Sequence, residues 1–257
     1  MAKVVDFQEL GLIQVPEKTE TYIPISHQEL VTKIKEAGTK HYGVSPYQET
    51  LEVNHRGQQM FGSLTFHHGS SLSGSGMDRS IGFRNSYDKT LPVGVCGGAQ
   101  VTVCSNLMFV GDIIKMRKHT QNVEEDLDKL IQKLFKDVDA RYDQAHSDAG
   151  YMQEIPLSNE QAADYLGQLF VNQNVLNSSQ INKAADEWFN SKDFTSRTLW
   201  SAYNACTEAL KSAHPSNALE KYTKLHTFTE DYTLTAYKEH LQGEFASLEG
   251  SEPPMWV

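Results

Sequence analysis

Two groups of basic and hydrogen-bonding residues are the part of this sequence whose types and spacing could do chemistry. They stand near the two ends of the stretch 79–120, and the apolar runs between them are typical of β-strands. Phosphate oxygens accept hydrogen bonds from arginine and lysine, and from neutral donors such as asparagine and serine, when fixed elements hold those donors. We therefore predict that a sheet brings both groups to one phosphate-binding or nucleic-acid-binding site, formed by Arg84, Asn85, Ser86, Lys89, Lys115, Arg117 and Lys118.

Asp88 and His119 lie in the same two groups and are the candidates for catalysis. In an enzyme acting on a phosphoester or a nucleotide, Asp88 would be the general base and His119 the acid. The segment RNSYDK is more typical of a structural turn than of a catalytic site, because Asn, Ser and Asp side chains bond their own backbone. The sequence contains no G-x-S-x-G elbow and no phosphate-binding glycine loop. The residues leave open whether the protein is an enzyme and favour a binding protein.

The charge of the chain is distributed unevenly. The net charge is −10, which argues against a general binder of polyanions. Residues 79–120 carry six basic and two acidic residues, a net charge of +4, so the rest of the chain carries −14. This asymmetry fits a local basic patch on an acidic body, and it fits solvated strand ends equally well. Aromatic residues near the basic groups could stack bases or form core; they are Phe61, Phe66, Phe83, Tyr87 and Phe109.

The histidines and cysteines do not show the spacing of a metal site. There is no H-E-x-x-H and no zinc-type Cys/His spacing. His226 and His240 are two heptads apart, about 21 Å along a helix, so they cannot hold one ion. We expect no metal and no cofactor. Cys96, Cys104 and Cys206 form no C-x-x-C pair and are expected to be reduced core thiols.

The elements that must position these residues begin with an antiparallel sheet. Residues 1–25, with Pro16 and Pro24, are expected to be an extended arm that ends in an edge strand. Ser26 and Glu29 form a capping box that begins a short helix, which Gly38 closes. Alternation predicts a hairpin of strands 47–53 and 59–67, and 69–76 is a flexible loop by composition. Further strands are predicted at 80–83, 91–95 and 100–110, with a turn or bulge at Gly97–Gly98.

The remainder of the chain is predicted to be helical. Asn122 and Glu125 suggest a capping box for an amphipathic helix of about six turns. Further helices are expected after Ser158, after Ser179, over 198–211 and over 218–241. The fold class is therefore α+β, an N-terminal antiparallel sheet with a flanking helix followed by a mostly helical C-terminal half. The expected organisation is an arm at 1–25, a sheet domain at 26–119, a helical region packed on it at 120–245 and a flexible tail at 246–257.

The chain shows no signal for a membrane. No run of 18 apolar residues is present, and the start MAKVVDFQEL lacks the apolar core of a signal peptide. We therefore expect a protein of the cytoplasm, or of a host's cytoplasm.

Three segments resemble one family. They are GFRNSYDKTLPVGVCGGAQVTVCSNLMFVGD followed by RKHT, the earlier TETYIPISHQELV, and the helical RTLWSAYNACTEALK. They are similar to the phage/plasmid-like family called domain of unknown function 932, over about Thr21–Thr229. The resemblance implies a phage or mobile-element origin and no settled activity. Its motif positions would be Arg84, Asn85, Ser86, Asp88, Lys89, Arg117, Lys118, His119 and Thr120, and the family often has histidine where this chain has Tyr87.

The predicted order of a helix, a curved antiparallel sheet and a long helix resembles ring-forming single-strand annealing proteins. This likeness implies a nucleic-acid-binding protein that binds, or binds and anneals, single-stranded DNA in recombination or replication. Such a protein is expected to be a homo-oligomer, with a ring as one form. The alternatives are the phosphoester- or nucleotide-acting enzyme above, and a phage protein that binds and inhibits a host factor. The C-terminal PPMWV could dock in a partner's groove.

Overall fold

The computed structural model describes residues 2–54, 56–67, 76–101, 106–115 and 122–249, with side chains described as far as residue 235. Within these ranges all strands form one antiparallel sheet in the order β1-β2-β3-β4-β5-β6, with β7 paired to β5. The α+β class is confirmed. The strands are β1 (Ala2–Val4), β2 (Gln48–Asn54), β3 (Gln59–Phe66), β4 (Met77–Ser86), β5 (Gly94–Val101), β6 (Leu107–Phe109) and β7 (Ile114–Lys115). The helices are α1 (Phe7–Gly11), α2 (His27–Tyr42), α3 (Val123–Glu154), α4 (Asn159–Val171), α5 (Ser178–Asn190), α6 (Leu199–Leu210) and α7 (Ala218–Glu249).

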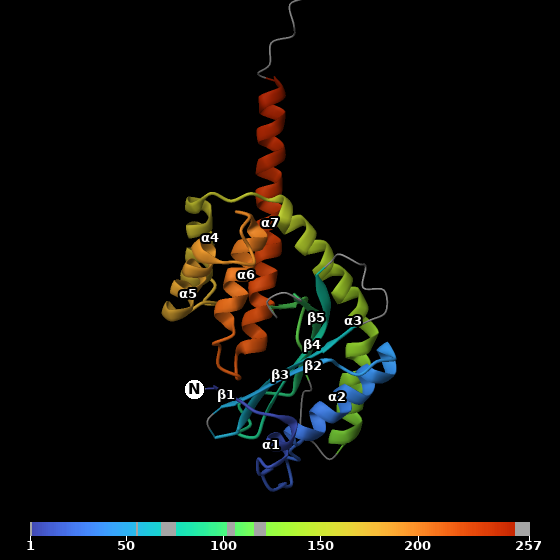
Figure 1. Ribbon diagram of the computed structural model, residues 1–257. Helices are drawn as coiled ribbons and strands as arrows, with labels where there is room; N and C mark the ends of the chain where they lie inside the picture. Colours follow the sequence, from blue (N-terminus) through green and yellow to red (C-terminus); the bar gives the residue numbers. More distant parts are fainter. Residues whose placement is uncertain (1, 55, 68–75, 102–105, 116–121, 250–257) are drawn as a thin grey trace, which may run out of the picture.

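The sheet lies between two helical layers (Figure 1). One core joins α1, α2 and the first half of α3 to one face of the sheet. A second core joins the opposite face to the later part of α3 and to α4, α5, α6 and α7. Antiparallel sheets commonly leave one face in water, but here both faces are covered, so β4 and β5 are almost wholly buried. Polar residues of these two strands must therefore find partners inside the protein.

Local sequence signals predicted several boundaries correctly. Oγ of Ser26 accepts a hydrogen bond from the backbone N–H of Glu29 and begins α2, as expected. The hairpin of β2 and β3 is confirmed, with Gly57 at φ 67° in its turn. The capping box of Ser158 and Gln161 begins α4. Cys96 and Cys206 are buried free thiols.

Two predicted glycine breaks were wrong, because both glycines serve close packing. Gly38 lies inside α2, which ends at Gly43 with φ 72°; a Cβ on Gly38 would overlap the ring of Phe66. Gly98, with Gly97, lies in the middle of β5 rather than in a turn. A Cβ on Gly98 would overlap the carbonyl oxygen of Met108, so this residue lets β6 approach β5.

Other elements differ in extent from the prediction. Residues 1–25 contain β1 and α1, and the expected edge strand at 19–25 is a single bridge between Thr19 and Tyr22. The structure shows no side-chain cap at Asn122, and α3 has 32 residues, longer than six turns. Asn177, rather than Ser179, caps α5, and α7 continues to Glu249. The expected loop at 69–75 and the last eight residues of the tail lie outside the described residues. None of the described helices is long and apolar enough to cross a membrane.

Candidate functional site

The register of the sheet brings Arg84 and Lys115 together. Arg84 on β4 pairs with Gly94 on β5, and Gly94 pairs on its other side with Lys115 on β7. Residues directly opposite one another across strands share a face of the sheet, so both basic side chains emerge on the same face. Gly94, between them, has no side chain to separate them. The sheet therefore places Arg84 and Lys115, one residue from each of the two basic groups, side by side.

Both cations reach one carboxylate oxygen, Oε1 of Glu220 on α7. Nη1 and Nη2 of Arg84 each lie 3.2 Å from it, and Nζ of Lys115 lies 3.5 Å from it. Burial raises the pKa of Glu220, but Arg84 and Lys115 outweigh this effect and hold the pKa below its ordinary value. Arg84 is only 1% exposed, whereas the side chain of Lys115 is 47% exposed. Glu220 thus ties the helical layer to the sheet through Arg84.

A groove of about 640 Å³ opens in front of this cluster. Lys115 and the loop Gly111–Ile113 form one wall, and α7 forms the other. The residues of α7 that line it are Glu220, Thr223, Lys224, Thr227, Phe228 and Asp231. Nε and Nη1 of Arg84, behind the groove, are buried and make no hydrogen bond to any described residue. A guanidinium carries five donors, so Arg84 has capacity for a further acceptor.

Asn85 points to the opposite face of the sheet, because successive side chains of a strand alternate. Its Nδ2 donates to the carbonyl oxygen of Ile25 at 2.8 Å and lies 3.0 Å from Nδ1 of His27. Its Oδ1 accepts from the backbone N–H of Ser86 at 2.9 Å. Asn85 is fully buried and holds α2 against the sheet. Neighbouring residues of the motif therefore fasten the two helical layers to opposite faces of β4.

The next three motif residues build the turn after β4. Oγ of Ser86 donates to the carbonyl oxygen of Leu91 at 2.8 Å and accepts from its N–H at 3.1 Å. Asp88 is exposed, and its carboxylate accepts from Thr90 and from Nε2 of Gln59. Lys89 has a left-handed φ of 62°, with its Nζ 4.5 Å from the centroid of the Tyr22 ring. The prediction placed all of RNSYDK in this turn, whereas Arg84, Asn85 and Ser86 belong to β4.

The remaining predicted site residues fall into two sets. Arg117, Lys118, His119 and Thr120 lie outside the described residues. The aromatic residues considered for base stacking are all core: Phe61, Phe66, Phe83, Tyr87 and Phe109 are each at most 3% exposed. Bases cannot stack on these rings while the fold is intact.

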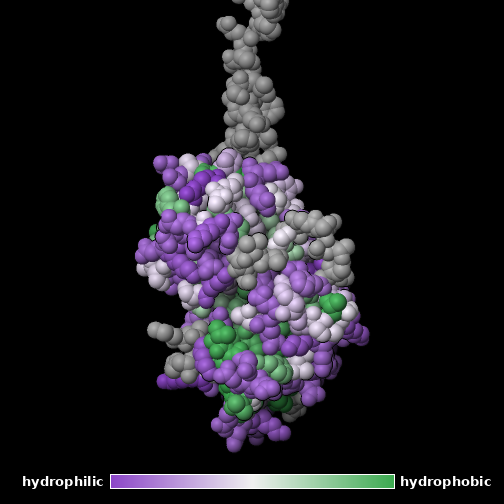
Figure 2. Space-filling view, viewed as in Figure 1, coloured by the Kyte–Doolittle hydropathy of each residue, from purple (hydrophilic) through white to green (hydrophobic). Residues whose placement is uncertain are grey.

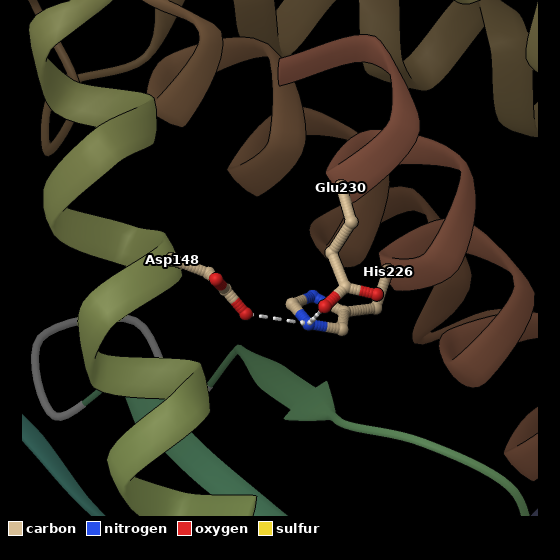
Figure 3. Close-up of side chains that lie close together, drawn as sticks. All are labelled: Asp148, His226 and Glu230. Carbon is tan, nitrogen blue, oxygen red and sulfur yellow. Dashed lines mark hydrogen bonds and ion pairs between the residues drawn. The ribbon is translucent and has the colours of Figure 1, made fainter. Parts of the chain in front are cut away.

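A second polar cluster lies between α3 and α7 (Figure 3). Nε2 of His226 lies 3.1 Å from Oδ2 of Asp148 and 3.7 Å from Oε1 of Glu230. The sequence signal for this cluster is not the spacing of His226 and His240, considered above. It is the spacing of His226 and Glu230, which are four residues apart and therefore on one side of a helix. Asp148 carries no local signal, because only the packing of α3 on α7 brings it close.

The fold and its buried motif define an α+β protein in which one antiparallel sheet is enclosed by helices on both faces. The chain belongs to the family described as a domain of unknown function (DUF932), whose model matches residues 17–237. This match confirms the family resemblance. No curated protein and no solved structure matches the chain.

Proposed function

We propose that this protein binds nucleic acid, with single-stranded DNA as the first candidate, by holding phosphates in the groove between β7 and α7. The observation that carries the proposal is the meeting of Arg84 and Lys115 at one carboxylate oxygen beside a groove of about 640 Å³. Nε of Arg84 makes no hydrogen bond to any described residue, and Nη1 is in ion-pair contact with Glu220 without a hydrogen bond. A phosphate offers several oxygens and would satisfy donors that a single carboxylate oxygen does not.

In this proposal Glu220 is the residue that phosphate must displace. Its carboxylate pairs with Arg84 and Lys115 when no ligand is bound, so an incoming phosphate competes with it for the same donors. Lys224 is exposed on the same groove and adds a cation that the described residues leave without an ion pair. In the sequence, Arg117 follows Lys115 after one residue and Lys118 after two. We include both in the proposed phosphate contacts on sequence grounds alone.

The test is fluorescence anisotropy with a short labelled single-stranded oligonucleotide over a range of salt concentrations. Phosphate contacts release counterions, so affinity should fall steeply with salt, and each lost contact should lower the log–log slope by about 1. The variant with both Lys115→Ala and Lys224→Ala should bind about tenfold or more weakly and show a shallower slope. Both side chains are largely exposed, so the variant should fold normally.

The matched control removes two lysines elsewhere. Lys129 and Lys133 are exposed on α3, outside the groove, and Lys129→Ala with Lys133→Ala changes the net charge by the same amount. Equal losses in the two double variants would mean that overall charge, and not the groove, drives binding. No binding by the unchanged protein at low salt would end the proposal.

We also propose that the protein self-associates through its N-terminal edge. Figure 2 shows apolar surface over the part of the molecule where β1 and α1 lie. β1 ends the sheet, Val4 is 68% exposed, and Leu12 next to α1 is 84% exposed. β1 is short and contains Lys3, but its free edge leaves backbone N–H and C=O groups that can pair with another chain beside the exposed Val4 and Leu12. Native mass spectrometry should show oligomers that Val4→Lys with Leu12→Glu reduces to monomers; a monomeric unchanged protein would refute this.

A cytoplasmic location is part of the same proposal, and the free thiols of Cys96 and Cys206 are consistent with it.

A further inference from the structure

The geometry points to a binding site for one divalent transition-metal ion, which we propose is formed by Asp148, His226 and Glu230. Asp148 comes from α3, and the other two residues come from successive turns of α7 (Figure 3). One ligand atom from each residue lies within 4.8 Å of the other two. The site is separate from the groove cluster at Glu220, and it does not depend on nucleic-acid binding.

The distances between the ligand atoms suit a common metal ion. A ligand bond of about 2.1 Å places neighbouring ligand atoms about 3.0 Å apart in an octahedral site and about 3.4 Å apart in a tetrahedral site. Nε2 of His226 lies 3.1 Å from Oδ2 of Asp148 and 3.7 Å from Oε1 of Glu230. Both contacts of Nε2 are within a few tenths of an ångström of these values, while the two carboxylate oxygens, within 4.8 Å of each other, would move closer together on binding an ion. Glu230 is half-buried, and it leaves the cluster open toward solvent on that side.

The charges of the cluster also favour the binding of a cation. Two carboxylates within 4.8 Å repel each other in a partly desolvated setting. The described residues bring no Lys or Arg into ion-pair contact with either carboxylate, and His226 is the only basic side chain within ion-pair reach of them. One imidazole in either protonation state cannot offset two negative charges, whereas a divalent ion offsets both and uses Nε2 as its third ligand.

Neighbouring groups hold the three ligands in place. Nε2 of Gln144 donates to Oδ1 of Asp148 at 2.7 Å, which leaves Oδ2 directed at His226. The His226 ring is completely buried and packs edge-on against Tyr203, with centroids 6.1 Å apart. Nδ1 of His226 and the hydroxyl of Tyr203 are buried without a hydrogen-bond partner among the described residues. The Nε2–Asp148 hydrogen bond and the packing on Tyr203 therefore orient the imidazole.

The ligand set indicates which ions fit. One imidazole with two carboxylates suits Mn²⁺, Fe²⁺ or Zn²⁺ better than Ca²⁺ or Mg²⁺, which favour oxygen ligands alone. Three protein ligands leave at least one coordination position for water or for an exogenous ligand. α7 would then carry both this ion and, through Glu220, one side of the groove.

The experiment measures ion binding to the full chain after dialysis against a chelator. Free Mn²⁺ gives a six-line electron paramagnetic resonance signal at room temperature, and its loss on titration reports bound ion; Zn²⁺ is measured by competition with a chromophoric chelator. We expect one ion per chain and a rise in melting temperature with added ion. Asp148→Asn with Glu230→Gln should weaken binding by at least about 100-fold, because neutral amides replace both anionic ligands.

Two controls separate this site from surface binding. His146→Gln removes a histidine of α3 that is not one of the proposed ligands, and Glu125→Gln removes an exposed carboxylate of the same helix. Both variants should bind the ion with unchanged stoichiometry and affinity. Equal binding by the Asp148→Asn, Glu230→Gln variant and the unchanged protein would overturn the site. So would a melting temperature that the ion does not change, since an ion bound only by the folded chain raises its stability.

Discussion

Nδ1 of His27, the first residue of α2, lies 3.0 Å from Nδ2 of Asn85 on β4, while Nε2 of the same ring lies 3.0 Å from the carbonyl oxygen of Gly57. Only a neutral imidazole fits both contacts, with Nε2–H donating to Gly57 and Nδ1 accepting from Asn85. Tyr87 stacks on the ring at a centroid distance of 3.8 Å, and its hydroxyl oxygen accepts from the backbone N–H of His27. Asn85 and Tyr87, both in the segment RNSYDK, thus fix the start of α2.

This arrangement predicts a loss of stability in mild acid. Burial lowers the pKa of His27 to about 4, against the weaker opposing effect of Gly57. The unfolded chain, with a histidine pKa near 6.5, binds more protons between these values, so stability is complete above about pH 6.5 and declines toward pH 4. The total loss is about 3 kcal/mol. Urea unfolding at pH 7 and pH 4.5 should show a larger loss for the unchanged protein than for His27→Gln, and equal losses would contradict the assignment.

Asn85→Ala should destabilise the protein without touching the proposed groove. The change leaves Nδ1 of His27, the carbonyl of Ile25 and the N–H of Ser86 without their partner, all in the interior. We expect a loss of about 2 to 4 kcal/mol, measured by urea unfolding. Asn190→Ala is the matched control, because Asn190 is exposed and bonds only Asp186 on its own helix. If Asn85→Ala lost no more stability than the control, Asn85 would not be needed to hold α2 against the sheet.

The sequence predicted those features whose cause is local. Ser26 and Ser158 begin helices through bonds to residues three positions away, and Gly57 supplies the φ that its hairpin turn requires. The α+β class follows from the change of hydrophobic period along the chain. Each of these signals is complete within a few neighbouring residues, so the sequence alone suffices to read it.

The features that the sequence did not reveal depend on partners far along the chain. Arg84 meets Glu220 across 136 positions, and Asn85 meets His27 across 58. The donor-rich segment does not lie on an open sheet surface, because α2 and α7 cover the two faces; Asn85 is enclosed, and Arg84 lies behind the groove beside Glu220. The Asp148–His226 contact spans 78 positions in the same way. The residues next to them in the sequence do not indicate which helix will cover each one.

Gly98→Ala tests the close approach of β6 to β5. The new methyl group would overlap the backbone carbonyl of Met108, and backbone cannot move aside as a flexible side chain can. We expect a loss of more than about 3 kcal/mol or a failure to fold. Gly150→Ala is the opposite case, because Gly150 is exposed within α3 and has nothing near the position of its Cβ. It should gain about 0.5 to 1 kcal/mol, and thermal melts of both variants measure the contrast. If Gly98→Ala were as stable as Gly150→Ala, β6 could not approach β5 as closely as the structure shows.

Glu220→Gln separates the structural role of the groove cluster from its proposed binding role. The change removes the charge that pairs with Arg84 and Lys115, so stability should fall by about 2 kcal/mol, less than for a fully buried pair because Glu220 is partly exposed. It also removes the competitor for phosphate, so oligonucleotide affinity should rise by about tenfold at low salt. Glu208→Gln, whose carboxylate pairs with Lys183 and Lys211 outside this groove, is the control. It removes the same charge, and its affinity should rise much less. If Glu220→Gln were less stable but bound the oligonucleotide no more tightly than the Glu208→Gln control, the cluster would have only a structural role. It would hold α7 to the sheet without binding phosphate.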